Sequence, residues 1–545
     1  MKIVIIGGVS GGSAAALRLR RLDENAEITV VERGHYPAYA NSALPYYTGG
    51  VMRNREQTFA AALEALRHDF NIKLLTEHNA VAINRQTHEV TAEHGGTEVV
   101  IPYDKLVLAT GSSPVVPSFA RDVSNVFTLG GVEDADAIVA AIENCVHHSA
   151  LVVGAGYSGL QMVENLSQRG LAITLVEARD QIMPHLDPEI AMPLLYELRQ
   201  RHVTVKLGTM VAAARMVNNA LEVGFTNGQV GYFDFAVVCA GRRPNTVLAA
   251  QCALPLTGGG HIRTNEYMQT GDTDIYAIGD VAGVSSPVGG ELTALPQAGP
   301  VNLEVRAMCS HLYGQPQPFR GLAGAAVAKL FAVEAACCGL TDKEAARRRI
   351  SGAHSVWVHE RGTQGLYPNI ERTQVKLTFD SEGRVLGAQA VGRRSVDHIV
   401  NAVSAVLSED GTVHDLACRE QAYTSPFSLG RGLLNLAGAV AENAVDGLYR
   451  LARYDQLNST FRNAYWLDVR PPEQFAEKHL PGFVNIPFKE LRERLDEIPR
   501  DRQVLILCLM GLKSYEASRI LTGRGYEEVY VLSGGMLTLA AAGLV

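Results

Sequence analysis

The sequence contains a cysteine whose surroundings suit a reactive thiol. Cys508 directly follows the apolar run 504–507, and Gly511, Lys513 and Ser514 follow it before a helix-like stretch. A cysteine that leaves a buried strand at the start of a helix meets converging backbone N–H groups, which stabilise its thiolate. The pattern therefore predicts a nucleophilic thiolate at Cys508. No Cys-x5-Arg pattern is present, which disfavours a phosphatase.

A glycine-rich turn near the N-terminus has the spacing of a dinucleotide-binding fold. Residues 3–6 are a β-branched run, the turn contains Gly7 and Gly12, and a helix-like stretch leads to a second run at residues 28–31. Gly7 permits a tight turn, Gly12 permits close helix packing, and the helix N-terminus faces a pyrophosphate. Glu32 stands 25 residues after Gly7 and can accept hydrogen bonds from both ribose hydroxyls. Val9 stands where such turns usually have a middle glycine.

The same pattern recurs in complete form from residue 151. Gly154, Gly156 and Gly159 separate an apolar run from a helix-like stretch, and Glu177 follows the next strand, 23 residues after Gly154. A carboxylate at this position favours the free ribose 2′-OH of NADH over the 2′-phosphate of NADPH, and the nearby Arg179 leaves NADPH open. Two dinucleotide sites in one chain predict electron transfer between two cofactors.

Three further segments, at residues 103–112, 240–245 and 273–280, resemble signatures of the pyridine nucleotide-disulfide oxidoreductases with two dinucleotide-binding folds. The resemblance implies that the first fold binds FAD, with Asp280 on the flavin ribitol, and that the second fold is inserted into the first and binds NAD. It also implies that the ring of Tyr157 shields the flavin until nicotinamide displaces it. The implied FAD site comprises Gly7, Gly12, Glu32, Arg33, Thr110, Gly111 and Asp280. The implied NAD site comprises Gly154, Gly156, Tyr157, Gly159, Glu177 and Gly241.

The C-terminal part of the chain resembles two further domains. Residues 326–445 have an α+β pattern with a hairpin turn at 380–383, and are similar to the dimerisation domain of this family. Within them, the segments around Tyr367 and Tyr423 resemble the two tyrosine segments of coenzyme A-disulfide reductases, which implies proton donors or substrate contacts across a dimer. Residues 455–545 resemble a rhodanese domain. This implies that Cys508 carries a persulfide sulfur, with Lys513 where rhodaneses commonly have arginine.

As a whole, the chain resembles the coenzyme A-disulfide reductase and NADH-dependent persulfide reductase family with a C-terminal rhodanese domain, and one residue departs from it. These enzymes have a redox cysteine in a segment of type Asn-Cys-(Gly/Ala)-Leu-Pro-Tyr, where this chain has Ser42. A hydroxyl cannot form the mixed disulfide that a thiolate forms. Ala38 and Gln161 also replace an expected serine and glutamate, which favours natural divergence. The resemblance places coenzyme A contacts at Arg18, Arg21 and Asn41.

Other cysteines offer few substitutes for the missing thiol. Cys337 and Cys338 are adjacent in an apolar stretch that we expect to be helical, where a buried structural role is favoured over redox chemistry. The eight cysteines are scattered without Cys-x-x-Cys pairs, which disfavours both a disulfide framework and a metal site.

Several domains are needed to position these motifs, and 545 residues predict three or four. We expect an α/β protein with two Rossmann-like domains, for FAD at 1–115 and 245–325 and for NAD(P) at 116–244, an α+β dimerisation domain at 326–445 and an α/β rhodanese domain at 455–545. The net charge of −8 lacks the basic excess that nucleic acid or an anionic membrane would need. The N-terminus leads directly into the first glycine turn without a signal peptide, so we expect a cytoplasmic protein.

The sequence thus predicts a homodimeric FAD flavoprotein in which NADH reduces the flavin beside Tyr157, and electrons pass to a small acceptor near Ser42. The resemblance implies that the acceptor is a persulfide, polysulfide or disulfide, such as one linked to coenzyme A, with Cys508 exchanging sulfane sulfur. Ser42 supports an alternative, a cysteine-independent flavin reductase that uses O₂, a quinone or another electrophile. A second alternative is a sulfur-carrier or sensor dimer whose FAD is structural.

Overall fold

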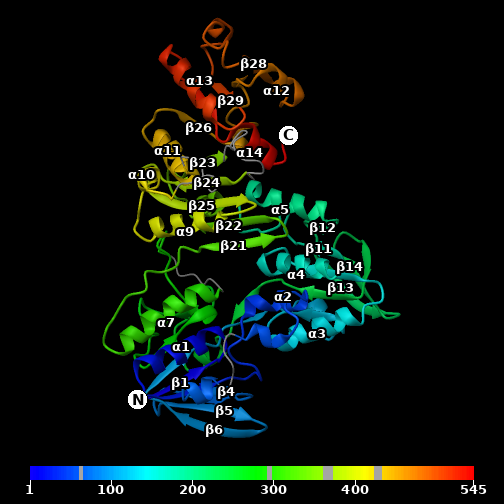
Figure 1. The fold of residues 1–545 in the computed structure, drawn as a ribbon, viewed down its shortest axis with the longest axis vertical. Coiled ribbons are helices and arrows are strands. Elements are labelled where there is room, and N and C mark those ends of the chain that lie inside the picture. Colours follow the sequence, from blue (N-terminus) through cyan, green and yellow to red (C-terminus); the bar gives the residue numbers. More distant parts are fainter. Residues whose placement is uncertain (60–64, 291–296, 360–371, 423–431) are drawn as a thin grey trace. The chain divides into compact units, whose positions relative to one another are not determined.

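The computed structural model describes residues 1–59, 65–290, 297–359, 372–422 and 432–545. Their contacts divide the chain into two compact units, one of Met1–Ile182 with His202–Leu322 and one of Met183–Arg201 with Ala323–Val545 (Figure 1). Both units combine helices with sheets, which confirms the expected α/β class. Helix α5 (Pro188–Gln200) lies inside the range predicted for the NAD(P)-binding domain but belongs to the second unit. The four domain boundaries stay a prediction.

The first glycine turn lies in a five-stranded parallel sheet of the first unit. The strand order is β19-β7-β1-β2-β3: the chain places β2 and β3 on one side of β1, and β7 and β19 on the other. In parallel sheets, ligands bind at the carboxyl ends of the strands at such a switch point. Helix α1 (Ser10–Leu22) follows β1 and packs on α7 (Ala298–Leu312). The strands are β1 (Lys2–Ile6), β2 (Glu27–Val31), β3 (Lys73–Leu75), β7 (Lys105–Leu108) and β19 (Ile275–Ala277).

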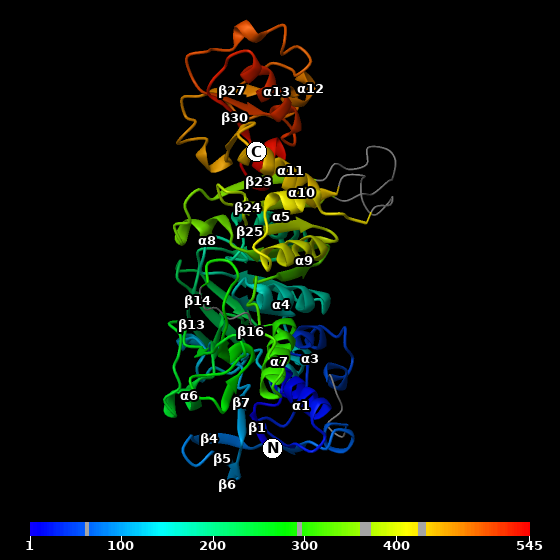
Figure 2. The same cartoon turned by 90° about the vertical axis from the view of Figure 1, so that its left-hand side faces the viewer.

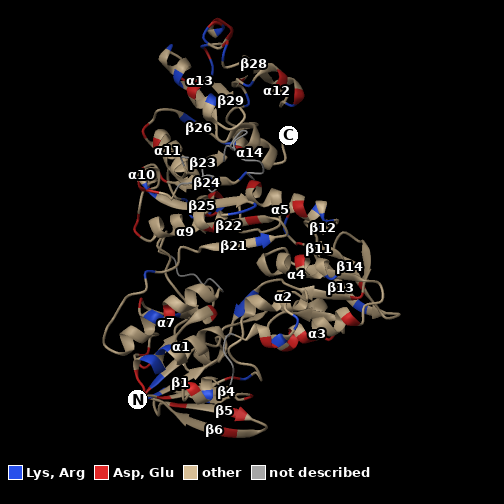
Figure 3. Ribbon diagram, in the orientation of Figure 1, with Lys and Arg blue, Asp and Glu red and all other residues tan. Residues whose placement is uncertain are grey.

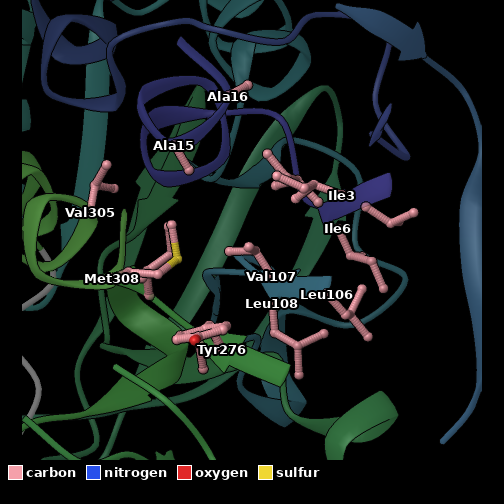
Figure 4. Close-up of a cluster of buried hydrophobic side chains, with 14 of the residues drawn as sticks. Ile3, Ile6, Ala15, Ala16, Leu106, Val107, Leu108, Tyr276, Val305 and Met308 are labelled. Atoms are coloured by element: carbon pink, nitrogen blue, oxygen red, sulfur yellow. The ribbon is translucent and has the colours of Figure 1, made fainter. Parts of the chain in front are cut away.

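Apolar side chains hold this sheet and its helices together. The strands are buried, and they therefore read as nearly continuous apolar runs instead of alternating ones. Figure 4 shows the cluster, in which Ile3, Ile6, Leu106 and Val107 from the strands lie near Met308 of α7. This core fixes the turn between β1 and α1 in place.

The second glycine turn lies in another five-stranded parallel sheet of the first unit, with the order β12-β11-β10-β16-β9. Helices α3 (Val132–Glu143) and α4 (Tyr157–Gln168) accompany it. The strands are β9 (Val126–Thr128), β10 (Ser149–Val153), β11 (Ala172–Val176), β12 (Thr204–Lys206) and β16 (Phe235–Val238). Four strands follow the same order in both sheets, and the fifth differs, since β19 comes last in the first sheet and β9 comes first in the second. The shared order of four parallel strands confirms the two predicted Rossmann-like folds.

Smaller elements complete the first unit. These are two three-stranded antiparallel sheets and two strand pairs. They are built from β4 (Asn79–Asn84), β5 (Glu89–His94), β6 (Thr97–Pro102), β13 (Val211–Val217), β14 (Ala220–Phe225), β15 (Val230–Phe233), β8 (Ser112–Pro114), β17 (Arg242–Pro244), β18 (Ile262–Arg263) and β20 (Ala282–Gly283). The short helices are η1 (Asn41–Ala43), α2 (Leu44–Thr48), η2 (Arg55–Thr58), η3 (Ala65–Asp69), η4 (Ser118–Ala120), α6 (Val247–Gln251) and η5 (Gly279–Val281).

The second unit begins with an antiparallel sheet of order β21-β22-β25-β24-β23, which bears out the predicted α+β domain and its hairpin (Figure 2). Helices α5 and α9 contact β22 and β25, and α11 contacts β23 and β24. The elements are β21 (Ala326–Leu330), β22 (Val333–Gly339), α8 (Asp342–Arg347), β23 (His354–His359), β24 (Gln374–Phe379), β25 (Val385–Gly392), α9 (Val396–Leu407), α10 (Val413–Cys418) and α11 (Leu433–Val445).

One expectation about this sheet is wrong. Cys337 and Cys338 lie in strand β22 and not in a helix. A short apolar run is compatible with a buried helix and with a buried strand, and here the pairing of β22 with β21 and β25 decides for the strand. Cys338 is buried, which fits the structural role that was favoured for the pair.

The second unit ends with a five-stranded parallel sheet of order β26-β30-β29-β27-β28. Its elements are β26 (Arg450–Ala452), η6 (Tyr454–Gln456), β27 (Tyr465–Asp468), α12 (Pro472–Glu477), β28 (Phe483–Asn485), η7 (Leu495–Glu497), β29 (Val504–Leu507), α13 (Leu512–Gly523), β30 (Val529–Leu532) and α14 (Gly535–Ala541). Cys508 directly follows β29 and therefore lies at the carboxyl edge of this sheet.

Acidic and basic residues are interspersed along both units (Figure 3). In the part of the chain that the structure describes, no helix is long and apolar enough to cross a membrane. Among the same residues, no group of three His, Cys, Asp or Glu side chains could hold a metal ion.

Candidate active site

The first glycine turn forms a narrow backbone cradle. Gly7 has a φ of +99°, and a Cβ on Gly12 would lie 1.7 Å from the Gly7 carbonyl oxygen, so neither position accepts a larger residue. Glu32, at the end of β2, accepts hydrogen bonds from the backbone N–H of Gly8 at 2.6 Å and of Gly34 at 2.7 Å. These bonds place the carboxylate beside the turn, as the spacing predicted. The neighbouring Arg33 is exposed.

The segment after β7 meets the segment after β19 at the same edge of the sheet. The Ser112 hydroxyl donates to Asp280 at 2.6 Å, and the Arg242 Nε donates to the Ser112 hydroxyl at 2.7 Å. Thr110 donates to the Asn245 carbonyl at 2.8 Å, and Gly111 has a φ of +65°. The structure therefore brings together the predicted Thr110, Gly111 and Asp280.

A buried carboxyl that sequence reasoning missed supports this edge. Glu304 on α7 accepts the backbone N–H of Gly279 at 2.6 Å, immediately before Asp280. Burial raises the pKa of Glu304 to about 7, although the hydrogen bond from Gly279 acts in the opposite direction. The only local sequence signal for this role is a glutamate on an otherwise apolar face of α7. Its partner, Gly279, lies 25 residues earlier in the chain.

The second glycine turn repeats the cradle. Gly154 has a φ of +102°, and a Cβ on Gly159 would lie 1.8 Å from the Gly154 carbonyl oxygen. In contrast, nothing lies within 4 Å of a Cβ placed on Gly156, so the backbone at the start of α4 is open to a ligand. Glu177 accepts the backbone N–H of Ala155 at 2.8 Å. Gly241, after β16, has a φ of +105° and is also open.

These two cradles fit dinucleotides. Each joins a tight glycine turn, the backbone N–H groups of a helix N-terminus for a pyrophosphate, and a carboxylate at the end of the next strand for a ribose. Tyr157 is the first residue of α4, directly after Gly156 of the second cradle, and is half-buried. The residues present therefore suit FAD at the first turn and NAD(P)H at the second.

The predicted acceptor segment lies in the same unit. Asn41 and Ser42 are exposed in η1, which continues into α2. Helix α2 packs on α4, the helix that starts at Tyr157. At this contact, the Arg169 Nε donates to the Thr48 carbonyl at 3.1 Å, and a Cβ on Gly49 would lie 2.4 Å from the Asn165 side chain. The Ser42 segment is thus connected, through α2, to the second dinucleotide-binding fold.

The predicted coenzyme A contacts on α1 differ in their surroundings. The Arg18 Nε is buried and has no hydrogen-bond partner, whereas Arg21 is exposed with its guanidinium 5.8 Å from the centre of the Phe70 ring. Arg20, between them, is buried and donates to four backbone carbonyls, including that of Phe70 at 2.9 Å. Arg20 is therefore a structural residue, and the substrate role of Arg18, Arg21 and Asn41 stays a prediction.

Cys508 lies at the start of a tight loop in the second unit. Its Sγ accepts the backbone N–H of Gly511 at 3.1 Å, and its carbonyl accepts the N–H of Met536 at 2.8 Å. A Cβ on Gly535 would lie 2.3 Å from that carbonyl oxygen, so α14 approaches the loop closely. Lys513 is exposed, donates to Glu516 at 2.6 Å and lies 4.5 Å from the Phe488 ring centre. The loop therefore offers the sulfur a backbone donor, as predicted.

A buried ion pair lies at the end of β27, the strand that pairs with β29 beside the Cys508 loop. Arg470 is buried and donates to both oxygens of Asp468, at 3.0 Å and 3.1 Å from Nε. Sequence reasoning assigned no role to this pair. Tyr367 and Tyr423 lie outside the described residues, so their roles stay predictions.

Fold and site together define a class of protein, an oxidoreductase with two dinucleotide cradles and a separate cysteine loop. The model of the pyridine nucleotide-disulphide oxidoreductases matches residues 1–300, that of their dimerisation domain matches 325–428, and that of the rhodanese-like domain matches 452–542. The chain belongs to the pyridine nucleotide-disulphide oxidoreductase family and is an enzyme of that family. FAD and NAD(P)H are the cofactors of this family.

Relatives and solved structures match most or nearly all of the chain. The coenzyme A disulfide reductase of Staphylococcus aureus (strain bovine RF122 / ET3-1) is 31% identical over 445 residues, which are 81% of this chain and 100% of the relative. The structure of reduced Bacillus anthracis CoADR-RHD is 34% identical with a TM-score of 0.95, over 99% of this chain and 98% of that one. An NAD-dependent persulfide reductase from A. fulgidus is 33% identical with a TM-score of 0.89, over 99% and 100%.

Proposed function

We propose that the protein uses NADH to reduce a small sulfur acceptor, and that its preferred acceptor is a persulfide, polysulfide or disulfide such as one linked to coenzyme A. The names of the relatives support the acceptor class. The main structural support is the packing of α2 on α4, because the Ser42 segment continues into α2 and α4 is the helix that starts at Tyr157. For a persulfide the overall reaction is NADH + H⁺ + RSSH → NAD⁺ + RSH + H₂S, which balances in atoms and charge.

Each cradle has a distinct task in this reaction. The backbone N–H groups at the N-termini of α1 and α4 would hold the pyrophosphates of FAD and NADH, and Glu32 and Glu177 would hold ribose hydroxyls. Asp280, which accepts a hydrogen bond from Ser112, would orient the ribitol of FAD, and FAD when bound would supply the transfer of the electron pair from NADH to the acceptor. The carboxylate of Glu177 disfavours a 2′-phosphate, so NADH is the preferred donor.

The Cys508 loop supplies sulfur chemistry of its own. The Cys508 thiolate attacks the outer sulfur of a persulfide, so that a Cys508–S bond forms, the S–S bond of the donor breaks and the donor thiolate leaves. The N–H of Gly511, which already bonds Sγ, stabilises the negative charge. The matched dimerisation domain supports a homodimer, and we assign the enzyme to the cytoplasm.

Ser42 determines how the acceptor is reduced. An enzyme hydroxyl forms no S–S bond, so reduction at this site proceeds without a mixed disulfide at residue 42. The same residue favours a second candidate function, a flavin reductase that passes electrons to O₂, a quinone or another electrophile. The two functions differ in which compound reoxidises the reduced enzyme.

An anaerobic stopped-flow experiment on the purified holoenzyme separates them. The enzyme is reduced with NADH and then mixed with coenzyme A persulfide, coenzyme A disulfide or menadione while flavin absorbance is followed. We expect rapid reoxidation by the persulfide, in Cys508→Ser as well as in the wild type. Reoxidation by menadione or air alone would contradict sulfur reduction and establish the second candidate.

A further inference from the structure

An ion pair borders the Cys508 loop at the start of α13. The Lys513 Nζ donates to the Glu516 Oε2 at 2.6 Å and lies 4.5 Å from the centre of the Phe488 ring. The side chains of Lys513 and Glu516 are 49% and 36% exposed. The charge of Lys513 is therefore compensated by a carboxylate of its own helix, and its ammonium also faces an aromatic ring.

Backbone hydrogen bonds place Phe488 beside the strand that leads to Cys508. The Phe488 N–H donates to the Val469 carbonyl at 3.0 Å, and the Val469 N–H donates to the Leu507 carbonyl at 2.9 Å. Leu507 is the last residue of β29, directly before Cys508. The Lys513 ammonium over the Phe488 ring therefore lies at the carboxyl edge of the sheet, the edge at which Cys508 lies.

The helix determines which way the pair faces. Lys513 and Glu516 are three residues apart, so their side chains are neighbours on the surface of α13. The buried residues of α13 form another face, and the helix contacts β29 and β30. These buried residues are Ser514, Ala517, Ser518 and Leu521. The pair thus meets solvent beside the loop through which a sulfur donor reaches the buried Cys508.

Sulfur donors differ in charge, and the pair discriminates between them. Thiosulfate is a dianion at neutral pH, whereas the persulfide of an uncharged thiol reacts through its protonated, uncharged form. A lysine without a partner at this place would attract the dianion, but the Glu516 carboxylate cancels the charge of Lys513 and itself repels the dianion. The Gly511 N–H, which bonds the Cys508 Sγ at 3.1 Å, stabilises the sulfur with either donor.

We propose that Glu516 is a specificity-determining residue of the Cys508 loop, and that it favours persulfides with an uncharged group next to the sulfur over thiosulfate. The inference rests on the proposed sulfur transfer at Cys508 and names the donor class. The pantetheine chain next to the sulfur of coenzyme A is uncharged, so coenzyme A persulfide belongs to the favoured class.

Thiosulfate is the disfavoured donor in a step of the same kind. The Cys508 thiolate attacks its outer sulfur, a Cys508–S bond forms, the S–S bond breaks, and sulfite leaves with the electron pair. The three negative charges of the reactants are all found again in the products, and no external oxidant or reductant is consumed. The two donors therefore differ in the charge that approaches Glu516 and not in the product formed at Cys508.

The rate at which Cys508 becomes persulfidated provides the test. The oxidised full-length holoenzyme, without NADH, is mixed at pH 7 and low salt with thiosulfate or with the persulfide of 2-mercaptoethanol. The reaction is quenched with an alkylating agent, and peptide mass spectrometry follows Cys508. Glu516→Gln should raise the ratio of the thiosulfate rate to the persulfide rate about tenfold, because the dianion then meets an uncompensated lysine. A ratio within twofold of the wild type would overturn the proposal.

Two further variants sharpen the test. Lys513→Gln should lower the same ratio about tenfold, because Glu516 then repels the dianion without compensation, and both shifts should shrink as salt is added. Glu527→Gln is the matched control, at an exposed glutamate that precedes β30 at the opposite edge of the sheet. A shift in Glu527→Gln equal to that in Glu516→Gln would also overturn the proposal.

The same measurement separates this inference from the function on which it rests. Persulfidation of Cys508 with a ratio that Glu516→Gln leaves unchanged would overturn the inference alone. Persulfidation by neither donor would overturn the proposed sulfur transfer at Cys508 and the inference with it. Circular dichroism shows whether each variant is folded.

Discussion

Replacement of Lys376 by methionine should strongly destabilise the second unit. Lys376 on β24 has a side chain only 4% exposed, and its ammonium lies 2.8 Å from Asp187, 2.6 Å from Glu189 and 2.8 Å from Asp342. These three carboxylates raise the pKa of Lys376 above its ordinary value, against the effect of its burial. Lys376→Met keeps most of the volume and removes the charge.

The magnitude follows from the partners that remain. Arg453, 3.3 Å from Asp342, then remains as a cation beside these carboxylates. Removing one partner of a buried ion pair costs about 3–5 kcal/mol, because the other charge stays buried without compensation. For a unit of this size, about 2–4 °C is lost per kcal/mol, so the unfolding midpoint should fall by about 6–20 °C.

The effect should also depend on pH. In the folded wild type, burial acts to raise the pKa of Asp187, but Lys376 and Gln389 hold it below its ordinary value. Such a carboxylate contributes stability that is present above its unfolded pKa and is lost as the pH falls through its folded pKa. Without Lys376 the Asp187 carboxylate protonates more readily, so the deficit of the variant should be smaller at pH 5 than at pH 8.

Tryptophan fluorescence provides the assay. The chain has two tryptophans, Trp357 and Trp466, and both lie in the second unit, with the Lys376 ammonium 5.7 Å from the Trp357 ring centre. Thermal unfolding of the holoenzyme followed by this signal therefore reports on the unit that carries the change. Lys329→Met, at an exposed lysine of the same sheet, is the control. A midpoint within about 2 °C of the wild type for Lys376→Met would refute the reasoning.

Three further changes test other parts of the molecule. Burial raises the pKa of Glu304 to about 7, so the folded protein retains a proton that the unfolded chain loses. The free energy of unfolding therefore falls by about 3 kcal/mol as the pH rises from about 4.5 to 7. Glu304→Gln should remove this dependence in thermal unfolding followed by far-ultraviolet circular dichroism at pH 5–8. Ser42→Cys should create or raise NADH-dependent reduction of coenzyme A disulfide relative to Ser42→Ala, and equal rates would mean that the pocket serves another substrate. Cys508→Ser should abolish sulfur transfer from a persulfide to a thiol and leave flavin reduction by NADH unchanged; residual transfer would assign that reaction to another residue.

The sequence predicted both cradles because their determinants are local. The glycines and the carboxylates Glu32 and Glu177 lie within one strand–turn–helix–strand unit each, where spacing alone decides which groups meet. The Cys508 loop was predictable for the same reason, since the strand, the turn and the helix start are consecutive. The strand at Cys337 and Cys338 was not, because its apolar run fits two secondary structures until neighbouring strands are known.

Interactions between distant segments required the tertiary structure. Lys376 meets Asp187 and Asp342 across 189 and 34 residues of sequence, and nothing in their local patterns pairs them. The contact of His414 on α10 with Glu442 on α11 likewise depends on the close crossing of the two helices at Gly438. The sequence by itself therefore determined the two dinucleotide-binding folds, the serine at residue 42 and the loop at Cys508. The tertiary structure decided which buried charges compensate each other, because that depends on chain packing that brings remote residues within a few ångströms.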